Sequence, residues 1–235
     1  MEVMSELQLA LHRLAGSRAG RNETLNLDAL DSENRESIDQ LLGEGEVSMH
    51  FLNANCQARV RESVLAGVWR VKYFNPEGAL TRDTIEVSDV PMLCRRHVFS
   101  HAAHRAEINR NAIPEGVESA PSLLAEINEK VAGYRPRQAS HVINLNLLAQ
   151  TEKDLGYLTD RLGKGPLTIR SRGYGNCHIT STAVEHVWWV QHFNSQDKST
   201  LNTLEIGGVP AVAAAAHEDL HDSRQRMAEI LETYR

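Results

Sequence analysis

The sequence has few cysteines, no long apolar run and no excess of basic residues. Cys56, Cys94 and Cys177 are the only cysteines among 235 residues, and no two of them form a CxxC pair. An odd number of scattered cysteines argues against a disulfide framework and predicts a reducing, cytoplasmic environment. No stretch approaches the roughly 18 apolar residues of a transmembrane helix. Charged side chains interrupt the short apolar stretch near the N-terminus, which therefore does not resemble a secretory signal.

The charge balance is acidic. The chain has 31 aspartates and glutamates against 25 lysines and arginines, a formal net charge of −6. Nucleic-acid-binding proteins usually present a basic surface, so we expect no nucleic-acid partner, and the balance suits a basic partner better. The apolar content of 41% and charged content of 24% are ordinary for a soluble globular protein.

The chain contains an internal duplication. The segment LNLDALDSENRESIDQLLGEGEVSM from Leu25 matches LNLLAQTEKDLGYLTDRLGKGPLTI from Leu145 at a shift of 120 residues. Farther on, VWRVKYFNPEGALTRDTIEVSDVP from Val68 matches VWWVQHFNSQDKSTLNTLEIGGVP from Val187 at a shift of 119. The pair Asn-Cys that ends at Cys56 also aligns with the pair that ends at Cys177, given small gaps. Matches in this order indicate two copies of one structural unit.

Both copies predict the same order of elements. Each opens with a strand and a polar helix, passes a G-x-G turn, and continues with strands that alternate or carry β-branched and aromatic residues. A helix is expected after each copy and another between them. The expected ranges are 25–27 and 145–147 for the opening strands, 33–42 and 152–162 for the helices, 46–51, 67–74, 83–87, 166–171, 186–193 and 202–206 for the later strands, 121–133 for the middle helix and about 211 onward for the last helix.

We therefore predict an α+β fold of two tandem similar units, each an antiparallel β-meander with flanking helices, related by a pseudo-twofold axis. The expected divisions are an N-terminal helical segment at 1–24, a first repeat unit at 25–108, a linker with a helix at 109–142, and a second repeat unit with the C-terminal helix at 143–235.

Several stretches form a specific combination: LLGEGEVS, GVWRV, LTIRSRGYGNCHITSTAVEHVWWVQHFNS, and NTLEIGGVP followed by AAHEDLHDSRQRMAEI. From about residue 20 to its C-terminus the chain resembles the HupH/HyaF family of hydrogenase expression and formation proteins. The resemblance implies a cytoplasmic accessory protein, without enzymatic activity or cofactor, in the maturation of a membrane-bound uptake [NiFe] hydrogenase. Its implied role is that of a chaperone that binds the iron–sulfur small-subunit precursor before twin-arginine export. The implied partners are this precursor, its signal peptide and other hydrogenase accessory proteins.

The neighbours Cys177 and His178 superficially offer a nucleophile and a base. Adjacent residues of a strand point to opposite faces, so His178 would not activate the thiol. The surrounding GYGNC lacks a nucleophile elbow and a full dinucleotide fingerprint. We predict no catalytic residue, and a hydrolase or transferase has only this pair in its support.

A second group of possible ligands lies in CRRHVFSHAAH. On a helix, His97 and His101 would have the i, i+4 spacing that can share a metal ion, and Cys94 and His104 would lie near the same face. Ten helical residues span about 15 Å, so all four could not reach one ion.

The i, i+4 spacing recurs at His217 and His221. A pair of such histidines could bind a metal ion together with ligands from other segments, which leaves one alternative function open. It is a metal or iron–sulfur carrier for hydrogenase assembly that uses Cys94, Cys177 and the histidines.

Two features predict recognition of a protein partner. The first is the C-terminal helix, where Glu218 and Asp222 are four residues apart and, with Asp219, would attract a basic partner such as a twin-arginine signal peptide. The second is RSRGYGN, which replaces HFLNAN of the first copy and from which Arg170, Arg172 and Tyr174 would project.

The tryptophans predict one core residue and one residue of open role. Trp69 of the first copy matches Trp188, which indicates a core position for both. Trp189, which replaces Arg70, faces the other way and is either a recognition residue or buried against a flanking helix. The predicted partner-binding residues are Arg172, Gly173, Tyr174, Gly175, Asn176, Cys177, Trp189, Glu218, Asp219 and Asp222.

Overall fold

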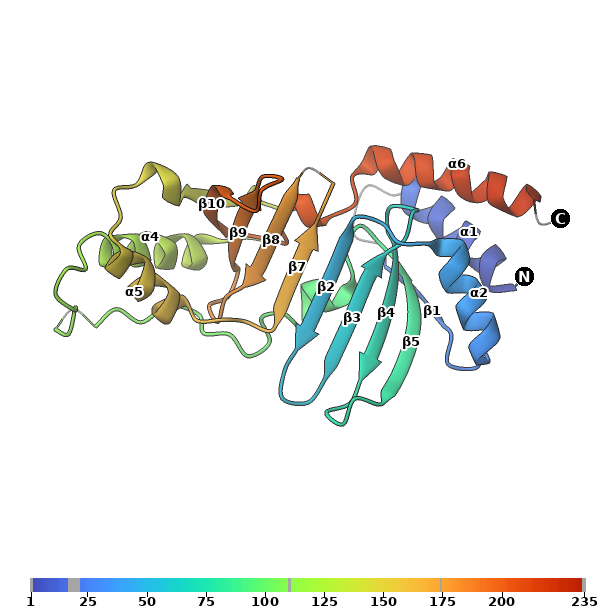
Figure 1. Cartoon of the computed structure of the whole chain (residues 1–235), viewed down its shortest axis with the longest axis horizontal. Helices are drawn as coiled ribbons and strands as arrows, with labels where there is room; N and C mark the ends of the chain where they lie inside the picture. The colour runs from blue at the N-terminus through green and yellow to red at the C-terminus, as the bar shows by residue number, and fades with distance from the viewer. Residues whose placement is uncertain (1, 17–21, 110, 174, 234–235) are drawn as a thin grey trace. The chain divides into compact units, whose positions relative to one another are not determined.

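The computed structural model describes residues 2–16, 22–109, 111–173 and 175–233. The chain divides into two compact units. Unit 1 consists of the residues up to Arg95 and those from Ala213 onward, and unit 2 consists of Arg96–Val212. Figure 1 shows the elements of both units in chain order.

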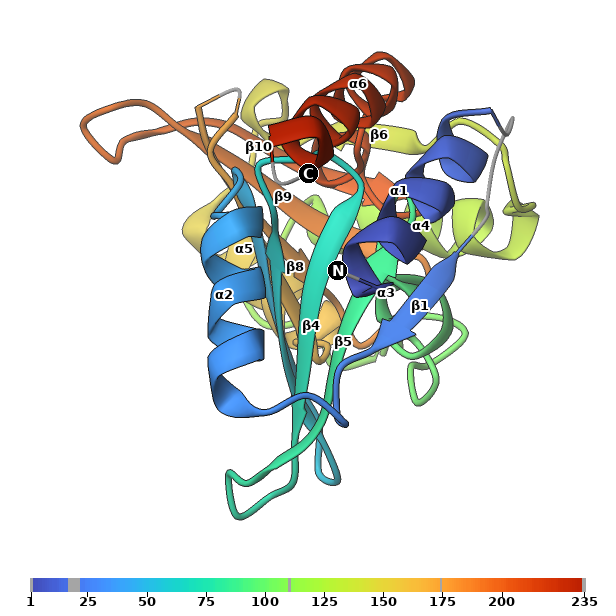
Figure 2. The ribbon, with the colours of Figure 1, turned by 90° about the vertical axis from the view of Figure 1, so that its right-hand side faces the viewer.

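In its described residues, unit 1 contains a five-stranded antiparallel sheet with the strand order β1-β5-β4-β3-β2. Three longer helices flank it (Figure 2). The bounds are α1 (Glu2–Ala15), β1 (Glu23–Asn26), α2 (Ser32–Leu42), β2 (Val47–Leu52), β3 (Gln57–Glu62), β4 (Val68–Phe74), β5 (Leu80–Val87), the short α3 (Met92–Arg96) at the end of the unit, and α6 (His217–Thr233).

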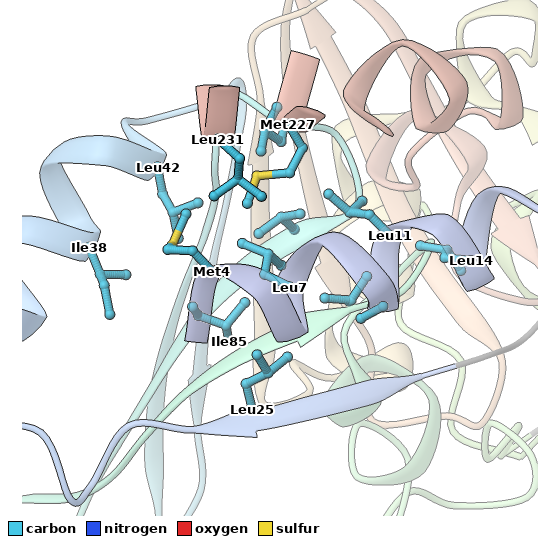
Figure 3. Close-up of a cluster of buried hydrophobic side chains, with 14 of the residues drawn as sticks. Met4, Leu7, Leu11, Leu14, Leu25, Ile38, Leu42, Ile85, Met227 and Leu231 are labelled. Carbon is cyan, nitrogen blue, oxygen red and sulfur yellow. The ribbon is translucent and has the colours of Figure 1, made fainter. Parts of the chain in front are cut away.

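One hydrophobic cluster of unit 1 lies between one face of this sheet and the helices α1, α2 and α6. Leucines and a methionine recur on α1 at helical spacing, and they meet β1, β5, α2 and α6 in the centre of Figure 3. The members of this cluster are buried, so their removal from water stabilises this face of the unit. Its labelled members are Met4, Leu7, Leu11, Leu14, Leu25, Ile38, Leu42, Ile85, Met227 and Leu231.

In its described residues, unit 2 contains a second five-stranded antiparallel sheet with the order β7-β8-β9-β10-β6. Helices α4 and α5 contribute to a core on one face of it. The bounds are α4 (Ala120–Gly133), β6 (His141–Asn144), a 3-10 turn (Leu145–Leu147), α5 (Glu152–Leu162), β7 (Leu167–Ser171), β8 (Asn176–Ser181), β9 (Val187–Phe193), β10 (Ser199–Ile206) and a 3-10 turn (Ala211–Ala213).

The two units have the same sheet order, which confirms the predicted α+β fold of two similar β-meanders with flanking helices. The predicted helices at 33–42, 152–162 and 121–133 are confirmed with end shifts of one residue at most. The pseudo-twofold relation stays a prediction. Among the described residues, no helix is long and apolar enough to cross a bilayer.

The C-terminal helix differs from its predicted place. It begins at His217 rather than near Ala211, and it packs against α1 in unit 1 instead of completing the second repeat. The reason is complementarity, because Leu220, Met227 and Leu231 are all buried in the cluster to which α1 contributes its apolar face.

The opening strand of the second copy also differs from the prediction. LNL at 145–147 is a 3-10 turn, and the strand is β6, just before it. Asn144 pairs with Thr203 as Asn26 pairs with Thr84, so the equivalence across the repeat is shifted by two residues. The two LNL segments are identical in sequence but not equivalent in structure, because the connection from the strand to the helix is two residues longer in the second copy.

The alignment of the cysteines was wrong for a similar reason. Cys177 lies opposite His192, and Ala58 lies opposite Tyr73 at the same place in the first sheet. Cys177 is therefore equivalent to Ala58, and Cys56 lies in the turn before that strand.

The G-x-G turns end α2 and α5 in the same way. Gly43 and Gly163 have φ values of 59° and 60° with extended ψ, a conformation almost restricted to glycine. A Cβ at Gly163 would also lie 3.0 Å from the Cβ of Ala183.

We expect Gly163→Ala to lower the free energy of unfolding by about 1 to 2 kcal/mol, because alanine at this φ is strained. Urea denaturation of both variants and the wild type measures this. Gly156→Ala is the matched control on the same helix, where a Cβ meets nothing within 4 Å. It should stabilise the protein by about 0.5 to 1 kcal/mol through helix propensity. Equal effects of the two substitutions would contradict the role of the turn.

Candidate functional site

The predicted partner-binding hairpin borders a cavity in unit 2. The cavity has a volume of about 360 Å³ and lies at the end of β7, β8 and β9. Its lining residues are Arg170, Ser171, Arg172, Asn176, His178, Phe193 and Asp197.

The strand register places these side chains together. Arg170 lies opposite His178, and Asn176 lies opposite Phe193, so alternate residues of three neighbouring strands share one face. Gly173 and Gly175 form a bridge in the turn, where Gly175 has a φ of 92°. Tyr174, predicted to project from this turn, lies outside the described residues.

The cavity is polar and locally basic. Arg170 and Arg172 are exposed, and neither forms an ion pair within the described ranges of the chain. The rings of His178 and Phe193 lie 4.9 Å apart and are tilted. Asp197 is contributed by the turn between β9 and β10 and has a positive φ of 55°. Such a set can hold an oxyanion beside an aromatic surface.

Cys177 does not share this cavity. Its side chain is 1% exposed on the opposite face of β8, and its Sγ lies 3.8 Å from Nε2 of His192. Burial, helped by the negative charge of Glu205, raises the pKa of the thiol to about 11. The thiol is therefore protonated at neutral pH and is a poor nucleophile. The buried position does not support the predicted role of Cys177 in partner binding.

The two tryptophans take different places. Trp188 is 1% exposed and meets the ring of Phe99 edge-on at 5.1 Å, as predicted for a core residue. Trp189 packs against the core to which α4 and α5 contribute, and its Nε1 donates a hydrogen bond to Oδ1 of Asn202 at 2.5 Å. Of the two roles left open for Trp189, the structure favours burial against the flanking helices.

Sequence reasoning identified Arg70 as the counterpart of Trp189 in unit 1 but did not predict its ion pairs. Arg70 is buried and bonds to Asp83, which is the residue equivalent to Asn202, and to Asp39 of α2. The same cross-strand pair is thus an ionic contact in one unit and an indole–amide contact in the other.

The histidine group does not form the predicted helical face. The helix α3 ends at Arg96, so His97 and His101 lie in the turns that follow it. His104 is exposed, with Nδ1 2.8 Å from Oε2 of Glu185. In residues 2–16, 22–109, 111–173 and 175–233, no three His, Cys, Asp or Glu side chains are grouped so that they could hold a metal ion.

Cys94 is also buried, and its Sγ donates to Sδ of Met49 at 3.3 Å. Burial, reinforced by the charge of Glu86, raises the pKa of this thiol far above its usual range. Metal ligation requires the thiolate, so neither Cys94 nor Cys177 is prepared as a ligand.

The acidic residues of the C-terminal helix form a separate surface in unit 1. Glu218, Asp219 and Asp222 are all exposed in the first turns of α6. His217 and His221 lie on the same turns with ring centroids 5.1 Å apart. Of the predicted partner-binding residues that the structure describes, only Arg172 and Asn176 line the cavity of unit 2.

Comparison with known proteins agrees with this duplicated architecture. The model of the HupH hydrogenase expression protein, C-terminal conserved region, matches residues 1–107 and again 117–234. The chain belongs to the HupH family. The two matches to the HupH region bear out the internal repeat, one in each half of the chain.

Curated relatives in the HupH family span most of the chain. The hydrogenase expression/formation protein HoxQ of Cupriavidus necator is 45% identical over 210 residues, which cover 89% of this chain and 73% of HoxQ. HupH of Rhodobacter capsulatus is 42% identical over 236 residues, with coverage of 99% and 82%. The hydrogenase-1 operon protein HyaF of Escherichia coli is 31% identical over 232 residues, with coverage of 97% and 79%.

A solved structure is also similar. The hydrogenase expression protein HupH from Thiobacillus denitrificans is 27% identical, with a TM-score of 0.46, and the match covers 49% of this chain and 96% of that one.

Proposed function

We propose that the protein is a cytoplasmic, non-enzymatic chaperone that binds the iron–sulfur small-subunit precursor of a [NiFe] uptake hydrogenase before export. The observation that carries this proposal is the HupH region, which occurs twice and spans nearly the whole chain. Its relatives are named as hydrogenase expression and formation proteins, which fits an accessory role.

The chemistry of the cavity supports binding rather than catalysis. Arg170, Arg172 and Asn176 offer hydrogen bonds, and His178 packs on Phe193 instead of orienting a nucleophile. Cys177, the nucleophile that the sequence suggested, is buried on the other face of the strand. The carrier alternative draws no support from the two buried, protonated thiols.

The acidic surface of α6 supports a contact with the signal peptide. Glu218, Asp219 and Asp222 are exposed and can attract a segment with two adjacent arginines. The body of the small subunit would then be bound elsewhere on the chain.

We expect anaerobic pull-down with the full chain to capture the small-subunit precursor both with and without its signal peptide. The triple variant Glu218→Gln, Asp219→Asn, Asp222→Asn should capture the form with the signal peptide about fivefold or more weakly, because exposed charge pairs add up over several contacts. Capture of the form without the signal peptide should not change.

The matched control removes three exposed carboxylates outside the first turns of α6, on α2, on α4 and at the far end of α6: Glu36→Gln, Glu129→Gln and Glu232→Gln. It makes the same change in net charge and should leave both captures unchanged. Failure of the wild type to capture either form would overturn the chaperone proposal. A stoichiometric, cysteine-dependent metal in the purified protein, found together with that failure, would establish the carrier instead.

A further inference from the structure

The cavity of unit 2 is a basic site in an acidic protein. The chain carries a net charge of −6, yet two arginines without ion-pair partners in the described part of the chain line a single cavity. Several other arginines have partners, such as Arg13 with Glu23 and Arg95 with Asp89. Unpaired guanidinium groups at a cavity leave their charge available for an external anion.

The repeat supplies an internal comparison. His50 lies opposite Arg59 as Arg170 lies opposite His178, so unit 1 has His50 where unit 2 has Arg170. By the same register Leu52 stands where unit 2 has Arg172. The two arginines thus occur in the second copy and not at the equivalent positions of the first.

The aromatic wall of the cavity is common to both copies. Phe74 is equivalent to Phe193, since they face Gln57 and Asn176 in their sheets. In unit 1 the guanidinium carbon of Arg59 lies 5.1 Å from the centre of the Phe74 ring. In unit 2 the ring of His178 takes this place. Unit 2 therefore has a histidine against the aromatic ring and arginines in the cavity wall, whereas unit 1 has an arginine against the ring.

The other lining groups indicate the kind of anion. The amide of Asn176 can both donate to and accept from a peptide backbone, and Phe193 offers apolar surface to a side chain. The carboxylate of Asp197 stands in the same wall, which disfavours a dianion such as phosphate more than a singly charged carboxylate. A volume of about 360 Å³ is at the low end for ligand pockets and suits one or two side chains.

We infer that this cavity binds an acidic peptide segment, with Arg170 and Arg172 on a carboxylate and Phe193 against an adjacent apolar side chain. The inference rests on the proposed function, because the small-subunit precursor would supply this segment. It places the contact with the body of the client in the second repeat, apart from the signal-peptide contact proposed for α6.

The test is a titration of the full chain with a short peptide. Binding is measured by NMR and by calorimetry. The probe is an acetylated, amidated pentapeptide that contains two glutamates and a leucine, and its counterpart has glutamine at both acidic positions. We expect the acidic peptide to bind, the glutamine peptide to bind at least tenfold more weakly, and added salt to weaken binding of the acidic peptide.

The double variant Arg170→Gln, Arg172→Gln should bind the acidic peptide at least tenfold more weakly than the wild type does. Its melting temperature should stay near that of the wild type, since both side chains are exposed. The control Arg59→Gln, Arg61→Gln makes the same charge change on β3 and should bind like the wild type. Equal binding of the two peptides, unchanged binding by the Arg170/Arg172 variant, or tighter binding of inorganic phosphate would overturn the inference.

The same variant in the pull-down separates this inference from the proposed function. Loss of capture of the precursor without its signal peptide supports both. If the acidic peptide binds in an arginine-dependent way but wild-type protein captures no precursor, the site stands and the client assignment fails. If the precursor is captured equally by wild type and variant, and the peptide does not bind, the chaperone proposal stands and the acidic-segment site is wrong.

Discussion

Asp154→Ala should lower the free energy of unfolding by about 2 to 4 kcal/mol, because it leaves one buried and several partly buried backbone donors without a partner. Asp154 is 0% exposed, and its Oδ1 accepts hydrogen bonds from the N–H groups of Glu118, Ser119 and Ala120, each at 2.9 Å. Its Oδ2 accepts from the N–H and hydroxyl of Thr151 at 3.0 Å. One carboxylate thus joins the beginnings of α4 and α5.

The ionised form of Asp154 is the stable one. Burial alone would raise the pKa of this carboxyl, but the N–H groups of Ala120 and Thr151 outweigh burial and hold the pKa well below its usual range. For a lowered pKa, the stabilisation is fully present above the unfolded value of about 3.9 and is lost as the pH falls through the folded value. The difference between wild type and variant should therefore be constant from pH 5 to 8 and narrow only below about pH 4.

Urea denaturation with the melting temperature as a second measure tests this prediction. Asp160→Ala is the matched control, an exposed aspartate on the same helix, and should change stability by about 0.5 kcal/mol or less. A loss below about 1 kcal/mol for Asp154→Ala would mean that water replaces the carboxylate and that the junction of α4 and α5 does not depend on it.

Glu62→Gln should have the opposite effect to Asp154→Ala and raise the free energy of unfolding by about 2 to 3 kcal/mol at pH 8. Glu62 is 8% exposed at the end of β3. Burial raises the pKa of this carboxyl to about 7, and the negative charges of Glu46 and Asp219 add to the effect against the N–H groups of Gly67 and Val47. Glutamine keeps an acceptor for those N–H groups without the charge.

The pH dependence follows from the direction of the shift. The folded state holds the proton on Glu62 at pH values where the unfolded state has lost it, so wild-type stability falls as the pH rises from about 4.5 to about 7. Glu62→Gln should match the wild type near pH 4.5, gain on it through this window, and keep a constant advantage above it. Melting temperatures at pH 5, 6, 7 and 8 measure the gain. Glu46→Gln, at a neighbouring carboxylate, is the control for removal of one charge.

A difference in melting temperature between wild type and Glu62→Gln that stays the same from pH 5 to pH 8 would contradict the prediction. In the second copy the equivalent residue is Ser181, whose side chain is uncharged. Its Oγ accepts from the N–H of Leu167 at 3.0 Å. The acid in the first copy is thus a difference between the repeats rather than a requirement of the fold.

Local patterns in the sequence predicted most of the elements, because each depends on neighbouring residues, but the expected strand ranges did not include β3 (Gln57–Glu62) or β8 (Asn176–Ser181). The turn glycines Gly43 and Gly163 have positive φ in both copies, and the tryptophans Trp69 and Trp188 are buried in both. The place of α6 could not be predicted in this way. Its apolar positions fit many helices or sheets, and only packing against the apolar stripe of α1 in the folded unit selects among them.

The site was predicted in part for a related reason. Arg172 and Asn176 stood out because the copies differ there, whereas His178 and Phe193 enter the cavity through strand register. A hairpin register deduced from the β7–β8 turn would have brought Arg170 and His178 together. Asp197 belongs to a different turn, and no local pattern connects it with Arg170.

The return of α6 to unit 1 affects the order in which the protein is made. Translation produces every strand and helix of unit 2 before the residues of α6 exist, although unit 1 begins the chain. Unit 1 therefore cannot complete the packing around the apolar stripe of α1 until α6 has emerged from the ribosome. The second repeat, which carries the basic cavity, can fold and meet a partner while the first is still incomplete.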